Sequence, residues 1–195
     1  MYYRGVVCLE TSRIICWLRG DPEFVAVARR ARSLLGLQGV AVLMVSDTTR
    51  VDCDAIVCCG CSAEEICRDD PWSSLFEALS PRRRFHTLRI GVDPGSLCSL
   101  AAYADNFLIW LEKNECTVIT TRTKWLTSIV PASHVIVNVG SGPGWERVAR
   151  ELSSLGVSFR IVSETETSSK PLHSRLRYEI KDEDLLAAMT ISLSS

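Results

Sequence analysis

"RIGVDPGSLCSLAAYADNFLIWLEK", residues 89–113, decides how the second half of this chain folds. A short apolar run ends at Asp93, and the Asp-Pro-Gly sequence that begins there is typical of a turn. Two further extended runs follow at 99–105 and 107–113. We therefore expect strands joined by tight turns. Asp93 can be read as a metal-binding carboxylate or as a turn former that bonds its own backbone, and both readings stay open.

The rest of this half alternates between strand-like and helix-like segments. "CTVITTR" (116–122) predicts a further strand and "KWLTSIV" (124–130) a short helix, because β-branched residues favour strands. A buried strand at 134–140, a helix at 144–156, a strand at 157–164 and a helix at 182–195 come next. The predicted succession is three meandering strands, then helix, strand, helix, strand, helix, which places the chain in the α/β class.

Residues 1–80 predict a separate small α/β unit. "GVVCLETSRIICWLRG" (5–20) indicates a β-hairpin, and a helix follows at 21–36 with Asp21 as its N-cap and Pro22 in its first turn. Two short apolar strands and a second helix at 69–80 complete the unit, and no chemical motif marks its role. The stretch 81–88, rich in arginine, predicts a basic linker that either clamps a phosphate backbone or is a solvated connection before the domain at 89–195.

Composition excludes several classes of protein. The 195 residues carry a formal net charge of −1, so any contact with nucleic acid must be local. No apolar run reaches the roughly 18 residues of a membrane-spanning helix, and the first residues lack a signal-peptide pattern. We expect a cytoplasmic protein with no membrane partner.

Five of the nine cysteines fall between Cys53 and Cys67. Their spacing lacks the paired C-x₂-C pattern of zinc sites and no histidine is near. "DAIVCCGCS" therefore predicts a buried strand in which cysteine is a small apolar filler, while a metal site or one or two disulfides are the alternatives.

The order of elements and three local sequences resemble the ribonuclease H-like fold, and within it the RuvC-type resolvases. "GVDPGS" (91–96) is similar to their opening strand and turn, "VIVNVGSG" (135–142) to their fourth strand, and "DLLAAMTIS" (184–192) to their closing helix. The resemblance covers residues 89–195. It implies a hydrolase that cleaves phosphodiester bonds in structured DNA or RNA with Mg²⁺ or Mn²⁺, acting as a homodimer.

The resemblance also implies a catalytic metal site. Asp93 and Asp184 match the first and last carboxylates of the family, and Asp182 is a further candidate ligand. Two positions depart from the pattern, because Asn138 replaces a strand glutamate and Lys181 stands where a second helix acid is common. Either the nuclease is degenerate, or Asp182, Glu164 or Glu166 compensates. Acids at the start of a helix can also serve only as an N-cap and first-turn charges.

Two segments predict contacts with nucleic acid. Lys170, Arg175 and Arg177 lie in a basic stretch without acids, and Ser141 and Gly142 lie in a glycine-rich loop between a strand and a helix. The leading interpretation is therefore a RuvC-like nuclease or its degenerate nucleic-acid-binding relative. A non-catalytic interaction module on the same fold, or an actin-like nucleotide-binding protein, remains the alternative.

Overall fold

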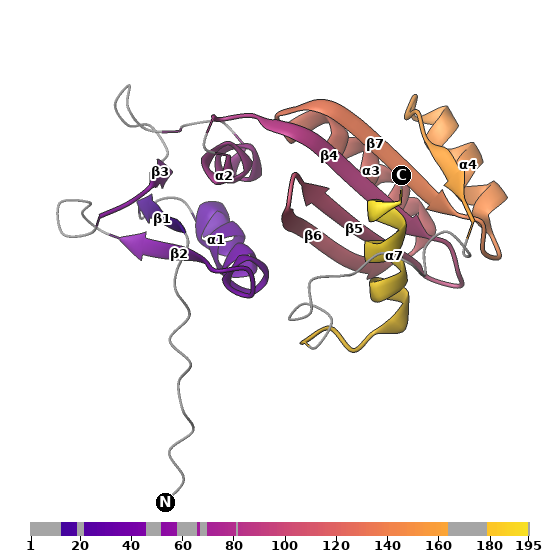
Figure 1. Ribbon diagram of the computed structural model, residues 1–195, viewed down its shortest axis with the longest axis horizontal. Helices are drawn as coiled ribbons and strands as arrows, with labels where there is room; N and C mark the ends of the chain where they lie inside the picture. Colours follow the sequence, from indigo (N-terminus) through magenta and orange to yellow (C-terminus); the bar gives the residue numbers. More distant parts are fainter. Residues whose placement is uncertain are drawn as a thin grey trace, which may run out of the picture.

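A computed structural model describes residues 13–18, 22–45, 52–57, 66, 70–80, 82–163 and 179–194. Its described elements form two sheets, one of three strands and one of five, with helices on both (Figure 1). The predicted α/β class is confirmed. Within the described residues no helix is long and apolar enough to cross a membrane.

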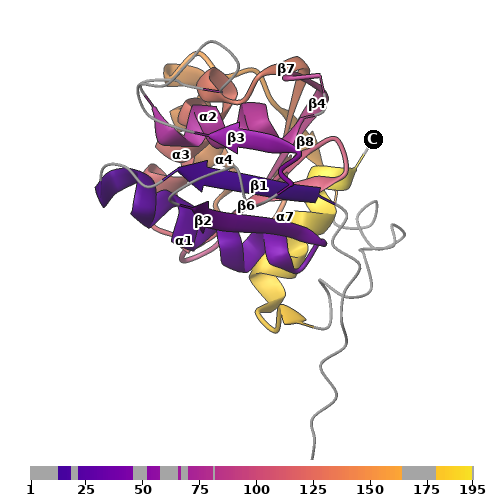
Figure 2. The same ribbon diagram turned by 90° about the vertical axis from the view of Figure 1, so that its left-hand side faces the viewer.

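The N-terminal unit is a parallel sheet in the order β2-β1-β3, whose strands lie side by side in Figure 2. Both edges of β1 are occupied by parallel partners, so the predicted hairpin is wrong for this strand, and its first arm lies outside the described residues. The unit is built from β1 (Arg13–Leu18), α1 (Pro22–Gly36), β2 (Val40–Val45), β3 (Ala55–Val57) and α2 (Pro71–Leu79).

Local signals place these helices. Helix α1 begins at Pro22 as predicted, while the proposed N-cap Asp21 lies outside the described residues. Asp70 caps α2, because its carboxylate accepts the backbone N–H of Trp72 at 3.1 Å and the hydroxyl of Ser73 at 2.9 Å. Such a cap satisfies a helix amide that has no partner within the helix.

Cysteine acts as a cross-link and not only as apolar filler. Cys16 of β1 is joined to Cys53 just before β3. The strand predicted from "DAIVCCGCS" extends over Ala55–Val57, and Cys58, Cys59 and Cys61 lie outside the described residues. The Cys16–Cys53 bond matches the alternative of one or two disulfides.

The second sheet has the strand order β6-β5-β4-β7-β8. Strands β4, β5 and β6 form an antiparallel meander, and β7 and β8 continue the sheet parallel to β4. Apart from the strand predicted at 116–122, this succession is the predicted one, and it is consistent with a ribonuclease H-like fold. The elements are β4 (Phe85–Asp93), β5 (Cys98–Ala104), β6 (Phe107–Asn114), α3 (Cys116–Ile129), β7 (Ala132–Gly140), α4 (Trp145–Ser154), β8 (Arg160–Val162) and α7 (Glu183–Leu193).

Helix α3 replaces the strand predicted at 116–122. Its buried residues recur at helical spacing, and its threonines satisfy their hydroxyls on the helix itself, as Thr121 does by donating to the carbonyl of Thr117 at 2.8 Å. Burial of one helix face against the sheet thus overrides the strand propensity of threonine, valine and isoleucine. The buried set is Cys116, Ile119, Thr120, Thr123 and Leu126.

Helices cover both faces of the second sheet. In Figure 1, α7 lies in front of the strands, whereas α3 and α4 lie behind them. Helix α7 crosses β4 at Gly91 so closely that a Cβ there would lie 2.8 Å from the Cα of Ser192. Gly91 is therefore the residue that allows α7 to approach the sheet.

The two units share one core. Leu35 and Val42 belong to the same buried cluster as Ile90 and Ile119 of the second sheet. Gln38, after α1, donates its amide to the carbonyl of Leu108 at 2.9 Å and accepts the N–H of Leu108 at 2.7 Å. Its side chain thereby satisfies both backbone groups of an edge-strand residue. Strand β4 begins at Phe85, inside the stretch predicted as a linker.

Candidate active site at the end of strand β4

Asp93 is the last residue of β4 and is half-buried. Its strand position is the one predicted from the sequence. It pairs in register with Ser99 of β5, and Ser99 pairs with Lys113 of β6. Paired residues share a face of the sheet, so these three side chains form a row on the face covered by α7.

Ser99 is fully buried in the middle of this row. Among the described residues, its hydroxyl is the one buried side-chain nitrogen or oxygen without a hydrogen-bond partner. An unsatisfied buried hydroxyl costs about 1–3 kcal/mol. The row between Asp93 and Lys113 is therefore not fully satisfied by the protein itself.

Lys113 binds both carboxylates that begin α7. Its Nζ lies 3.0 Å from Oδ2 of Asp182 and 2.6 Å from Oδ2 of Asp184. These two hydrogen bonds, that of Asp184 first, raise the pKa of Lys113, and its ammonium lowers the pKa of Asp182. The three side chains remain partly exposed, so solvent screens the pair. The cation that pairs with these two helix acids is thus Lys113 of β6, a residue that the sequence did not single out.

Asp182 also caps α7. Its Oδ1 accepts the backbone N–H of Asp184 at 3.0 Å and of Leu185 at 3.2 Å. Asp182 therefore combines an N-cap with an ion pair, the structural role that a first-turn acid can have without any metal.

Asn138 does not lie beside Asp93. It pairs with Gly91, and continuing this register by two residues brings Gly140 next to Asp93. A Cβ on Gly140 would lie 3.6 Å from Oδ1 of Asp93. The strand position adjacent to Asp93 thus carries no side chain at all.

Asn138 instead anchors the end of α7. Its side chain is fully buried and its amide nitrogen donates to the carbonyls of Ile191 at 2.7 Å and Ser194 at 3.1 Å. Its carbonyl oxygen accepts Nε of Arg160 at 2.7 Å, and Arg160 also donates to Ser194. Both polar atoms of this amide thus make hydrogen bonds within the protein, so Asn138 holds the end of α7 in place.

The glycine-rich loop is closed by its own backbone. The N–H of Ser141 donates to the carbonyl of Val162 at 3.0 Å, and the carbonyl of Gly142 accepts from Trp145 at 3.2 Å. Gly144 adopts a φ of 91° at the start of α4, a conformation that glycine permits. Ser141 is exposed and Gly142 is buried. Their assignment to nucleic-acid binding stays a prediction.

The predicted basic segment lies outside the described residues. Lys170, Arg175 and Arg177, and the compensating candidates Glu164 and Glu166, lie outside the described residues. In the part of the chain that the structure describes, no three histidine, cysteine, aspartate or glutamate side chains gather as metal ligands. Asp93 and the α7 carboxylates therefore do not by themselves fit the two-ion site that the resemblance implies.

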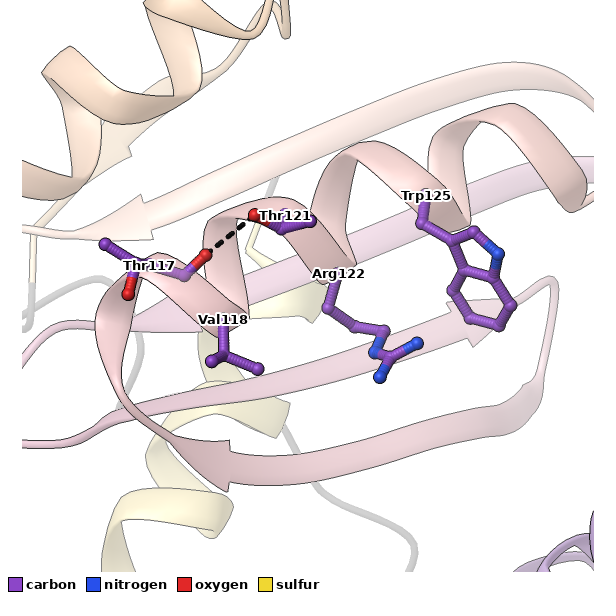
Figure 3. A pocket seen from close by; sticks show the side chains of 5 residues that line it. All are labelled: Thr117, Val118, Thr121, Arg122 and Trp125. Carbon is purple, nitrogen blue, oxygen red and sulfur yellow. Dashed lines mark hydrogen bonds between the residues drawn. The ribbon is translucent and has the colours of Figure 1, made fainter.

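A surface that the sequence did not predict lies on α3. An open cavity of about 470 Å³ is lined by Thr117, Val118, Thr121, Arg122 and Trp125, and their side chains project from one side of the helix (Figure 3). The guanidinium of Arg122 stacks on the rings of Trp110 and Trp125, at 4.9 and 4.8 Å from their centroids. Its Nε lies 3.3 Å from the carboxylate of Glu112, so this cation is already paired.

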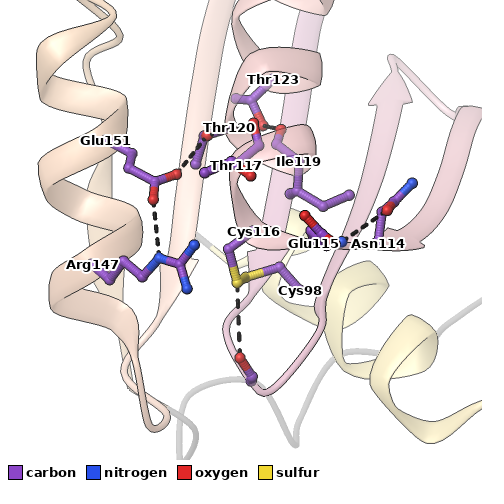
Figure 4. The surroundings of a disulfide bond; sticks show 11 residues. Cys98, Asn114, Glu115, Cys116, Thr117, Ile119, Thr120, Thr123, Arg147 and Glu151 are labelled. Atoms are coloured by element: carbon purple, nitrogen blue, oxygen red, sulfur yellow. Dashed lines mark hydrogen bonds and ion pairs between the residues drawn. A yellow bond between two sulfur atoms is a disulfide. The ribbon is translucent and has the colours of Figure 1, made fainter.

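A disulfide holds the turn after Asp93 against α3. Cys98, the first residue of β5, is bonded to Cys116, the first residue of α3 (Figure 4). The sulfur of Cys116 also lies 3.8 Å from the carbonyl of Gly95. The Asp93–Cys98 segment is thereby tethered at both ends, by β4 and by the cross-link.

Comparison with known proteins gives a distant structural likeness. No protein-family model and no curated protein matches this chain. Among solved structures, the chain is similar to RuvC of T. thermophilus, solved in complex with a Holliday junction substrate, at 16% identity and a TM-score of 0.39. The match covers 55% of this chain and 92% of RuvC.

Proposed function

We propose that this chain is a nucleic-acid-binding protein built on a ribonuclease H-like fold, in which the metal ligands of the phosphodiester-cleaving site are incomplete. The observation that carries the proposal is the ion pair of Lys113 with Asp182 and Asp184. Asp184, which the family resemblance assigns to metal binding, and the further candidate ligand Asp182 are both held by one ammonium group. A lysine in that place supplies positive charge permanently and needs no metal.

The chemistry of cleavage explains why this matters. Two-ion hydrolysis uses carboxylates that converge from several elements on ions about 3.5–4 Å apart. Here the two helix carboxylates are paired with one ammonium group, and the strand position beside Asp93 is Gly140. Asp93 alone carries too little negative charge to hold two hydrated divalent cations. Binding without cleavage is the function that these residues support best.

Binding assays test the proposal directly. The full chain is titrated by fluorescence anisotropy in EDTA with a four-way DNA junction, a duplex of matched sequence and a structured RNA hairpin. We expect binding to a structured nucleic acid that weakens steeply with salt, because phosphate contacts release counterions. Binding to none of the three would refute the proposed function and favour a protein-interaction module.

Cleavage assays test separately whether the metal site is incomplete. We expect no Mg²⁺- or Mn²⁺-dependent product above that of Asp93→Asn. A metal-dependent cleavage that Asp93→Asn abolishes would show that the site is complete, with ligands outside the described residues.

A matched pair of lysine variants tests the role of Lys113. Lys113→Ala releases two carboxylates, so we expect a larger thermal shift with Mn²⁺ than in the unmodified protein. Lys124→Ala, which removes an exposed lysine from α3, is the control and leaves the shift unchanged. If the unmodified protein already shows the shift of Lys113→Ala, the ion pair does not block metal binding and the proposal is wrong.

A further inference from the structure

We propose that the arginine-rich turn before β4 forms a second site, which binds a phosphate group at the end of the strand opposite to Asp93. A cavity of about 440 Å³ lies there, lined by Ser80, Arg82, Arg84, Phe85, His86, Asp105 and Ser133. Strand β4 has nine residues, so the two ends lie roughly 26 Å apart at about 3.3 Å per residue. The cavity is therefore separate from the candidate site at Asp93.

The turn is held in a defined conformation. Arg83 adopts a φ of 57° and its N–H donates to the carbonyl of Ser80 at 3.1 Å. The hydroxyl of Ser80 donates to the carbonyl of Arg84 at 2.7 Å, and Phe85 is buried behind it. Because the backbone is fixed on both sides, the arginines project from known positions and lose little backbone entropy on binding.

The charges that face the cavity favour an anion. Arg82 and Arg84 are exposed, and one guanidinium nitrogen of Arg84 donates to the carbonyl of Ala132 at 3.1 Å, which orients the group. The lining carboxylate, Asp105, accepts the backbone N–H groups of His86 at 3.2 Å and Thr87 at 2.8 Å. Two guanidinium groups thus face one carboxylate that is already hydrogen-bonded.

Arg83 does not contribute to this charge, because its guanidinium lies 4.0 Å from the carboxylate of Glu77 on α2. His86 adds a ring that packs edge-on against His134 of β7, with centroids 5.1 Å apart. His86, which lines the cavity, supplies a further N–H donor. Lys, Arg and His are the side chains that bind phosphate oxygens, and guanidinium suits them best because its donors form a planar fork.

The size of the cavity indicates more than a free anion. Volumes of about 300–1,000 Å³ are typical of small-molecule sites, so there is room for a phosphate with the sugar or base attached to it. The ligand class is therefore a phosphate ester, either one unit of a nucleic acid, in which case the site deepens the proposed function, or a free nucleotide.

Titration of the full chain with inorganic phosphate, followed by NMR, tests the site without nucleic acid. We expect saturable shifts in the resonances of His86 and Ser133. Arg82→Ala and Arg84→Ala weaken binding about tenfold each, the loss expected for one charged hydrogen bond. Arg84→Lys keeps the charge without the planar fork of donors, so its affinity for phosphate should lie between those of the unmodified protein and Arg84→Ala. Arg150→Ala, on the exposed side of α4, is the control and binds as the unmodified protein does.

Absence of saturable binding, or equal binding by Arg82→Ala and the unmodified protein, would overturn the inference. Two competitors identify the source of the phosphate. Displacement by a 5′-phosphorylated single-stranded DNA assigns the site to nucleic acid, whereas displacement by nucleoside monophosphate alone assigns it to a free nucleotide.

The two proposals fail independently. If the chain binds phosphate but no nucleic acid, the site stands and the proposed function falls. If Arg84→Ala binds nucleic acid with the same affinity and salt dependence as the unmodified protein, the function stands and nucleic acid is not the source of the phosphate; the site itself falls if Arg84→Ala also binds inorganic phosphate unchanged. If Arg84 contacts a phosphate within the complex, Arg84→Ala should instead lower the magnitude of the slope of log K against log salt by about 0.7–0.9.

Discussion

Gly91→Ala probes the closest contact between α7 and the second sheet. The added Cβ would meet the carbonyl oxygen of Ala188 and the backbone nitrogen and Cα of Ser192. All three are backbone atoms, so no side-chain rotation relieves the overlap. The Cα of Ser192 alone, at 2.8 Å, must retreat by 0.6 Å to reach ordinary contact at 3.4 Å.

The expected cost has two parts. Forcing an extra carbon into a packed core costs about 1–3 kcal/mol. Movement of α7 also strains the two hydrogen bonds from Asn138 to Ile191 and Ser194, worth about 1 kcal/mol each. We therefore expect Gly91→Ala to lower the free energy of unfolding by about 3–5 kcal/mol, a large share of the 5–15 kcal/mol of a typical domain.

Denaturation in guanidinium chloride, followed by tryptophan fluorescence, measures this change. Gly36→Ala is the matched control, because nothing lies within 4 Å of its added Cβ at the end of α1. It should leave stability within about 1 kcal/mol of the unmodified protein. Hydrogen exchange should show the lost protection concentrated in α7. Equal midpoints for Gly91→Ala and Gly36→Ala would refute the close approach of α7.

Three further predictions concern stability. Asn138→Leu should lower the free energy of unfolding by about 2–5 kcal/mol, measured by denaturation, because the three hydrogen bonds of a buried amide are lost, two to the carbonyls of Ile191 and Ser194 and one from Arg160; a neutral effect would contradict this. Reduction of the Cys98–Cys116 and Cys16–Cys53 bonds should cost about 3 and 4 kcal/mol, from closed loops of 18 and 37 residues, and single cysteine-pair variants should separate the two melting shifts. The first turn of α7 should lose protection from hydrogen exchange as pH falls below the ordinary Asp pKa of 3.8. The folded pKa of Asp182 is lowered, so its contribution to stability is complete above 3.8 and is lost as the pH falls through the lowered pKa. Protection that persists after Asp182 is protonated would show that Lys113 does not hold the helix.

The meander was predictable because its signals are local. Asp105 and Asn106 form a two-residue turn with a φ of 51° at Asp105, and an aspartate tolerates that conformation. Helix α3 was not predictable from propensity, since its threonines and valine favour a strand until the sheet buries one side of them.

Only the part of the candidate site that lies on strand β4 could be predicted from the sequence. Asp93 follows from the end of an apolar run, but the choice between Asn138 and Gly140 depends on the register of β7 against β4. Lys113 was missed because it meets Asp182 and Asp184 across 69 or more positions of sequence, through the crossing of α7 over β6. The one signal was a cation placed two residues after Leu111, on the same face of its strand.

The pairing of Gln38 with Leu108 has a consequence for solubility. Strand β6 is the edge of its sheet, and an open edge is a template on which a second chain can add a strand. One glutamine side chain occupies both backbone groups of Leu108 on this edge. Shortening the chain to the second sheet alone would expose this edge, and the fragment would be expected to associate through β6 into dimers or larger aggregates. The N-terminal unit is therefore expected to prevent self-association through β6.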